Sequence, residues 1–328
     1  MAPFIRATEI WLPSAAGNRL EWGGGLYGPL EDFKAISRQT TFDFDEGLPG
    51  RAWAARHPII LKEFQNSYFR RAIAAERAGL TCGIALPVFA GETLKAVIVF
   101  FCSETADDVG AIEIWSSNES RPLEIGLADA YYAAAELVEW TPRHIKFRSG
   151  FGPAGHVWAT SYGAGSGLPG CVWQSGRPCL VDEAFKAAHP PQWVEALPVG
   201  ISAGVGIPSL HDPRRSWVTT FLSSPRTPIA RRFEIWVPDD RGRALTLKAG
   251  NCATSADIMT AYKGVQLVPG DGLIGTAYRT LVPAVSENLR HEAELLRQSL
   301  ARAGLTSALA LPIMDKNGNP VAVVAWYS

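Results

Sequence analysis

Apolar and polar residues alternate along short stretches of this chain, a pattern typical of strands, and these stretches recur in the same order three times. Each round begins with the tripeptide Glu-Ile-Trp and continues through a glycine-rich turn, a proline-containing apolar run and a closing apolar run. The tripeptides are Glu9–Trp11, Glu113–Trp115 and Glu234–Trp236. The pattern predicts three repeated units, each starting with a strand-turn-strand.

The spacing between the glycine-rich turn and the proline of the next apolar run is nearly constant. It reads GLPGRAW at Gly47–Trp53, GLPGCVW at Gly167–Trp173 and GLIGTAY at Gly272–Tyr278. The proline of the next apolar run follows the first glycine by 40, 41 and 40 residues. Such agreement at three places favours a repeated structural unit over chance.

The closing apolar runs place the boundaries between the units. Unit 1 is predicted at 1–106, unit 2 at 107–227 and unit 3 at 228–328. From the tryptophan of the tripeptide to the glycine turn there are 36 residues in units 1 and 3 but 52 in unit 2. Unit 2 therefore holds an insertion of about 16 residues, expected within 137–165.

Within a unit the order is strand, strand, glycine turn, short helix, strand, longer helix, strand and strand. The longer helix is predicted over Tyr68–Ala78 in unit 1 and over Glu292–Ala303 in unit 3, where the composition favours helix. Gly79 and Gly304 follow these segments, as expected of residues that end a helix.

This combination of motifs resembles the GAF domain, a small sensor module. GLPGRAW followed by an apolar run such as IALPVF (Ile84–Phe89) carries the resemblance, which covers the whole chain as three tandem copies. It implies an α+β fold of the profilin-like class, with an antiparallel sheet of five or six strands and short helices in each unit. It also implies a sensory or regulatory role, without catalysis, in which a small molecule or a signalling protein partner is bound.

Composition narrows the classes of function. The 31 basic and 32 acidic residues give a net charge of -1, and no stretch concentrates the positive charge that nucleic acid needs. No apolar run approaches the ~18 residues of a membrane span, so we expect a cytoplasmic protein. The five cysteines lack a CxxC pattern and the six histidines are scattered, so we expect neither a metal site nor a cofactor.

The candidate ligand site lies in unit 1, which has the clearest set of motifs. A pocket is expected between helix and sheet, where an aromatic ring and one or two arginines would suit a small anionic or planar compound. The residues expected around it are Arg51, Trp53, Phe69, Arg70 and Cys82.

Two alternatives stay open. Some GAF-fold proteins reduce free methionine sulfoxide through cysteines near the glycine turn, and Cys171 with Cys179 flanks the short helix of unit 2. That chemistry needs a lowered thiol pKa, which a helix N-terminus and the nearby Arg177 could supply. The other alternative is a pure interaction scaffold whose pockets are closed by side chains.

We expect the apolar back face of each sheet to pack against another part of the protein. The closing runs carry apolar residues on both faces, as in Val97–Phe101, and no long helix flanks them. Large apolar surfaces are rarely left in water. We therefore expect the units to pack back-to-back within the chain, or two chains to form a homodimer through these faces.

Overall fold

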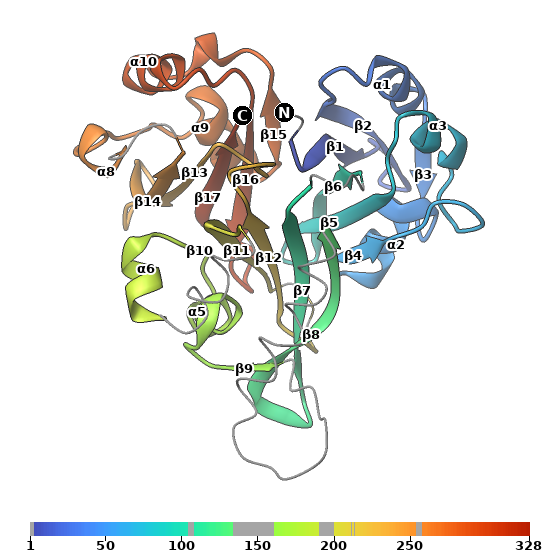
Figure 1. Cartoon of the computed structure of the whole chain (residues 1–328), viewed down its shortest axis with the longest axis horizontal. Helices are drawn as coiled ribbons and strands as arrows, with labels where there is room; N and C mark the ends of the chain where they lie inside the picture. The colour runs from blue at the N-terminus through green and yellow to red at the C-terminus, as the bar shows by residue number, and fades with distance from the viewer. Residues whose placement is uncertain are drawn as a thin grey trace.

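Three antiparallel sheets lie around a common centre, with the helices on the outside (Figure 1). The computed structural model describes residues 3–103, 108–133, 161–189, 200–210, 212, 214–253 and 258–328. Most of the insertion predicted within 137–165 lies outside the described residues. The strands of each sheet come from a single predicted unit.

Unit 1 forms a six-stranded sheet in the order β3-β2-β1-β6-β5-β4. Every neighbouring pair is antiparallel. Its elements are β1 (Ile5–Pro13), β2 (Arg19–Leu26), α1 (Glu31–Arg38), β3 (Thr41–Asp43), α2 (Gly47–Ala55), β4 (Ile59–Leu61), α3 (Ala72–Arg77), β5 (Cys82–Ala90) and β6 (Thr93–Cys102).

Unit 2 repeats this order with six strands, β9-β8-β7-β12-β11-β10 when read in the same direction. Its elements are β7 (Gly110–Asn118), β8 (Arg121–Ala133), β9 (Ser161–Gly163), α5 (Gly167–Ser175), β10 (Cys179–Leu180), α6 (Glu183–Ala188), β11 (Ala203–Ser209) and β12 (Trp217–Ser223).

Unit 3 has the same order with five strands, β14-β13-β17-β16-β15. At the place of the sixth strand a single bridge joins Leu245 to Leu267, where Leu20 pairs with Phe42 in unit 1. Its elements are β13 (Arg232–Pro238), β14 (Leu245–Cys252), α8 (Ile258–Ala261), α9 (Gly272–Thr280), β15 (Ala284–Ser286), the 3₁₀ helix η1 (Leu289–His291), α10 (Glu294–Arg302), β16 (Ala308–Met314) and β17 (Pro320–Tyr327).

The predicted α+β class, with antiparallel sheets of five or six strands, is confirmed. The longer helix of unit 3 is also confirmed, but the prediction of a helix over Tyr68–Ala78 is wrong at its start. There α3 begins only at Ala72, because the Ser67 hydroxyl donates to the Phe64 carbonyl at 2.8 Å and forms a local turn instead.

The glycine turns have a shared physical basis. Gly47 has a φ of +60°, a conformation that side chains disfavour, and it opens α2. A Cβ on Gly50 would lie 2.2 Å from the Asp43 carbonyl oxygen, so only glycine lets the helix approach β3 this closely. The corresponding positions in units 2 and 3 meet the same limits at Gly167, Gly170, Gly272 and Gly275.

The backs of the three sheets meet in one shared core. Their buried apolar side chains form a single cluster drawn from all three units. Three equivalent residues, Phe100, Phe221 and Trp326, pack together in it with ring centroids 4.7 to 5.4 Å apart, one pair stacked and two edge-to-face. The expectation that the units pack back-to-back within the chain is therefore confirmed.

The units are arranged head to tail in a closed ring. The strand after each glycine-turn helix packs on the second strand of the next unit. Thus β4 packs on β8, β10 on β13 and β14, and β15 on β2. The third contact closes the ring between the two units that are not consecutive in the chain (Figure 1).

Candidate functional site

Each unit buries the glutamate of its Glu-Ile-Trp tripeptide on the sheet face away from the shared core. Residues two apart on a strand share a face, so the indole Nε1 of the tryptophan donates to the carboxylate beside it. The donor–acceptor distances are 2.9 Å from Trp11 to Glu9, 3.1 Å from Trp115 to Glu113 and 2.7 Å from Trp236 to Glu234. From the sequence alone, this tripeptide indicated only the repeat and not the buried hydrogen bond within it.

In unit 1 a buried arginine neutralises the glutamate. Arg71, which precedes α3, donates from its two Nη atoms to the two oxygens of Glu9 at 2.7 and 2.8 Å. The hydroxyls of Ser37 and Tyr27 donate to the same carboxylate at 2.6 and 3.1 Å. The rings of Trp11, Phe33, Phe42, Phe69 and Phe101 surround the guanidinium at 4.8 to 5.6 Å.

Arg71 was missed among the candidate residues, although its neighbour Arg70 was chosen. The two arginines are consecutive in the sequence, and the backbone conformation at the start of α3 determines which side chain points into the core. The interior of unit 1, expected to be a pocket, is therefore filled by an ion pair and aromatic rings.

Unit 3 reaches the same arrangement from a different position in the chain. Arg232, on β13, places Nη2 2.6 Å from Glu234 and donates from Nη1 to Ser299 at 3.0 Å. The residue in unit 3 that corresponds to Arg71, counting back from the glycine after the helix, is Leu296. The residue in unit 1 that corresponds to Arg232 is Ala7. Units 1 and 3 thus both place an arginine beside the buried glutamate, but they take it from different positions in the sequence.

Unit 2 holds its glutamate without such a cation among the described residues. Thr220 and Tyr132 donate to Glu113 at 2.9 and 3.1 Å, in addition to Trp115. Burial raises the pKa of Glu113, and these neutral donors only partly oppose it.

Two openings lie on the helical side of units 1 and 3. The larger, about 450 Å³, lies between α1 and α3 directly over Arg71. The smaller, about 250 Å³, occupies the matching place between α8 and α10. The side chains around the larger opening are Ile36, Thr40, Arg70, Arg71, Ala72, Ile73, Ala74 and Arg77.

The structure brings some of the predicted ligand residues near this opening. Phe69 is buried and stacks on Phe64 at 4.0 Å, and it also faces Arg71. Arg70 lines the opening and pairs with Glu46 at 2.7 Å. Phe69 thus lies in the core of unit 1, whereas Arg70 lies at the surface, and a ligand role for either residue stays a prediction.

The other three predicted residues lie elsewhere. Arg51 places its guanidinium 3.8 Å over Tyr68, and Trp53 packs edge-on against the exposed ring of Phe44. The expectation that Cys82 borders the cavity is wrong, because Cys82 is fully buried in the shared core on the opposite face of the sheet. Both faces of β5 are buried, so apolar alternation did not show which one Cys82 would take.

The thiols of unit 2 form a small cluster with a histidine. Sγ of Cys171 lies 3.5 Å from Nε2 of His189. Nδ1 of His189 lies 3.0 Å from the Phe185 carbonyl oxygen, and Nε2 also lies 3.4 Å from the Gly165 carbonyl oxygen.

The cysteines of unit 2 do not have the lowered thiol pKa that the reductase alternative needs. Burial raises the pKa of Cys171, and burial together with Cys171 raises the pKa of Cys179 to about 11. Cys171 is the fifth residue of α5, past the free N–H groups of the first turn. The guanidinium of Arg177 extends instead to the Val321 carbonyl, at 3.4 Å.

The described residues contain no group of His, Cys, Asp or Glu side chains that could hold a metal ion. Nor is any helix within the described ranges long and apolar enough to cross a membrane.

A family model matches one unit of the chain. Residues 230–328 match the model of the GAF domain family. No curated protein matches the chain.

Solved structures resemble parts of the chain. The nlh2 GAF domain of A. aeolicus in an inactive state is 21% identical, with 31% of this chain and 59% of that chain covered and a TM-score of 0.25. Free methionine-R-sulfoxide reductase from Neisseria meningitidis in complex with its substrate is 13% identical, with 30% and 52% covered and a TM-score of 0.24. This chain thus spans a little over half the length of these two relatives.

Proposed function

Because unit 3 is a GAF domain and units 1 and 2 repeat its strand order, we propose that this chain is a non-catalytic sensory or regulatory protein. Its proposed ligand is a small organic anion with an apolar part, bound in unit 1 at the opening over Arg71. The observation that carries this proposal is the set of three arginines around that opening.

The charges at the opening favour an anion. Glu9 balances Arg71 and Glu46 balances Arg70, whereas Arg77 has no carboxylate partner among the described residues. Ile36 and Ile73, which are 43% and 66% exposed, offer apolar contact beside the guanidinium groups. Ligand sites typically combine an apolar lining with a few polar groups of this kind.

The test is calorimetric titration of the full chain with a panel of small carboxylates and phosphorylated compounds. Replacing Arg70 and Arg77 together by alanine should weaken the best ligand about tenfold or more, since a hydrogen bond to a charged group contributes about 1.5–3 kcal/mol. Arg241→Ala, at an exposed turn of unit 3, is the matched control and should leave the affinity unchanged. Equal affinity for the double variant and the wild type would contradict the proposal.

The contact between Cys171 and His189 favours a second candidate, a GAF-fold thiol reductase acting on free methionine sulfoxide. The raised pKa of both thiols in this unit argues against it. The assay is turnover of free methionine sulfoxide with a dithiol reductant, in wild type and Cys171→Ser. Turnover that disappears in the variant would replace the sensory proposal by an enzymatic one.

A third candidate, an interaction scaffold for a signalling protein partner, is favoured by the filled interiors of units 1 and 3. It would be preferred if no anion in the panel binds and binding of a protein partner is lost on Ile73→Asp.

A further inference from the structure

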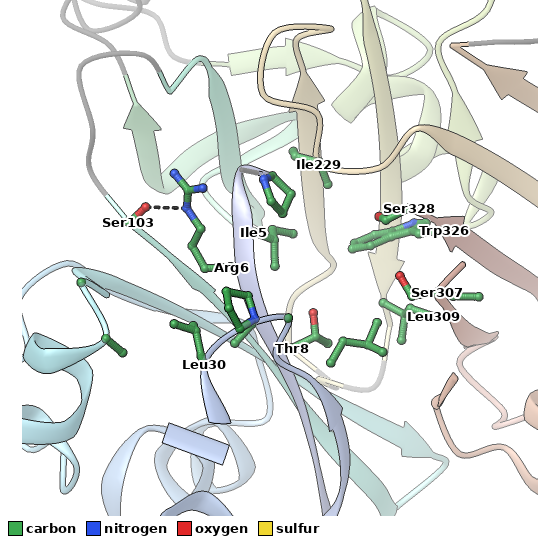
Figure 2. Close-up of a pocket in the computed structure, with 18 residues that line it drawn as sticks. Ile5, Arg6, Thr8, Leu30, Ser103, Ile229, Ser307, Leu309, Trp326 and Ser328 are labelled. Carbon is green, nitrogen blue, oxygen red and sulfur yellow. Dashed lines mark hydrogen bonds between the residues drawn. The ribbon is translucent and has the colours of Figure 1, made fainter. Parts of the chain in front are cut away.

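A cavity of about 580 Å³ lies between units 1 and 3 (Figure 2). Unit 1 contributes the start of β1, the end of β2 and the loop that follows, and unit 3 contributes the start of β16 and the end of β17. Pro29 and Ser328 at the rim are exposed, so the cavity opens to solvent. The larger apolar side chains of its wall are Ile5, Leu26, Leu30, Ile229, Leu309 and Trp326.

The ring geometry explains why this seam is hollow. Leu26 in β2 and Tyr131 in β8 hold the same register position, opposite the residue that precedes the buried glutamate. Likewise Ile229 lies five residues before Glu234 in unit 3. Phe4 lies five residues before Glu9 in unit 1, so the two residues are equivalent. Between units 1 and 2 the rings of Phe4 and Tyr131 fill the space, with centroids 5.9 Å apart. Between units 3 and 1 the smaller Ile229 and Leu26 leave it open.

The polar groups in the wall favour an uncharged ligand. Arg6 donates to both carboxylate oxygens of Asp108, at 2.9 and 3.0 Å, and to the hydroxyl of Ser103 at 2.6 Å. Its charge is therefore already balanced. The hydroxyls of Thr8 and Ser307 line the cavity and make no hydrogen bond with the described residues, so they are available to a ligand.

The position of the cavity also gives it a mechanical role. The chain itself joins unit 1 to unit 2 and unit 2 to unit 3, but units 1 and 3 meet only through non-covalent contacts. A molecule that touches both walls adds contacts at the one seam without a covalent connection. It would hold the ring closed.

We propose that this cavity binds a neutral, predominantly apolar small molecule that carries a hydroxyl or carbonyl group, and that binding ties unit 3 to unit 1. A volume of 580 Å³ lies within the ~300–1,000 Å³ of small-molecule sites. The site is separate from the anion site proposed over Arg71, because the two openings share no lining residue.

The test uses N-phenyl-1-naphthylamine, a neutral apolar probe whose fluorescence rises on leaving water, with the full chain. Wild type should bind one probe saturably, and binding should raise the midpoint of thermal unfolding. Leu26→Tyr combined with Ile229→Phe copies the filled seam and should weaken probe binding at least tenfold. Each single change should weaken it at least threefold, which keeps the test usable if the double variant does not fold.

Leu123→Tyr is the matched control, since Leu123 is 80% exposed in unit 2 and does not line the cavity. It should leave the affinity for the probe unchanged. The proposal is overturned if wild type shows no saturable binding, or if folded filling variants bind as wild type does. It is also overturned if the Arg70→Ala, Arg77→Ala variant loses the probe instead, since the probe would then occupy the unit 1 opening. Failure of anion binding alone would leave this site intact.

Discussion

Replacing Arg71 by leucine should destabilise the protein more than any ordinary surface change. The variant leaves the Glu9 carboxylate fully buried without the cation that now contacts both of its oxygens. Breaking a buried ion pair by removing one partner typically costs about 3–5 kcal/mol. Ser37, Tyr27 and Trp11 still donate to Glu9, so we expect a value near the lower end, about 3 kcal/mol.

The arrangement in unit 3 supplies the rescue. Ala7 corresponds to Arg232, and Arg71 corresponds to Leu296, so Ala7→Arg combined with Arg71→Leu copies unit 3 into unit 1. This variant should recover a large part of the lost stability, because a strand arginine two residues before the glutamate can reach it. Glu9→Gln combined with Arg71→Leu should also recover part of it, because no uncompensated charge remains.

Urea unfolding followed by circular dichroism measures these differences. The four proteins are compared at one pH and one ionic strength, and the midpoint is read together with the slope. If the free energy of unfolding of Arg71→Leu lies within about 1 kcal/mol of the wild-type value, the ion pair does not stabilise unit 1 as reasoned. If only the Ala7→Arg rescue fails, the equivalence between units 1 and 3 is wrong while the ion pair stands.

Three further outcomes are expected. Burial raises the pKa of Glu113, so the contribution of this carboxyl to stability is lost as pH rises from about 4.5, the ordinary value, through the folded pKa. In urea titrations the difference in unfolding free energy between Glu113→Gln and wild type should therefore move in favour of the variant over that range. A constant difference would contradict this. Iodoacetamide should label Cys171 more slowly at neutral pH than a free cysteine does, because burial raises the pKa of its thiol. The labelling rate is measured by mass spectrometry, and a faster rate than that of free cysteine would contradict this reasoning. Gly50→Ala should lower the unfolding midpoint more than Gly79→Ala, because the first Cβ meets a carbonyl oxygen at 2.2 Å, whereas the second meets open space and adds only the backbone strain of a φ of +68°; a larger loss for Gly79→Ala would refute the close approach.

The fold was predictable because it is encoded three times. A single copy of a weak strand pattern is ambiguous, but agreement among three copies at spacings of 40, 41 and 40 residues is not. The same strand order in all three sheets follows from this. The shared core followed from the apolar residues on both faces of runs such as Val97–Phe101.

The candidate site was predictable only in part. Arg70 lines the opening and Phe69 lies in the core beside Arg71, because both belong to the segment that packs over the sheet; their binding of a ligand stays a prediction. Arg71 was missed since a helix that begins later than its composition suggests changes which side chain turns inward. The cavity between units 1 and 3 was beyond reach of the sequence, because it arises from two substitutions of smaller side chains at a contact between units far apart in the chain.

The closed ring changes how ligand binding in one unit can affect another. In a chain of separate modules a change in unit 1 reaches unit 3 only through unit 2. Here Trp326 of unit 3 stacks on Phe100 of unit 1 at 5.1 Å, and both pack on Phe221 of unit 2. Tightly packed interiors transmit displacement because they contain few voids. A shift of one sheet therefore presses directly on the other two, and the cavity leaves room for such a shift at the seam between units 1 and 3.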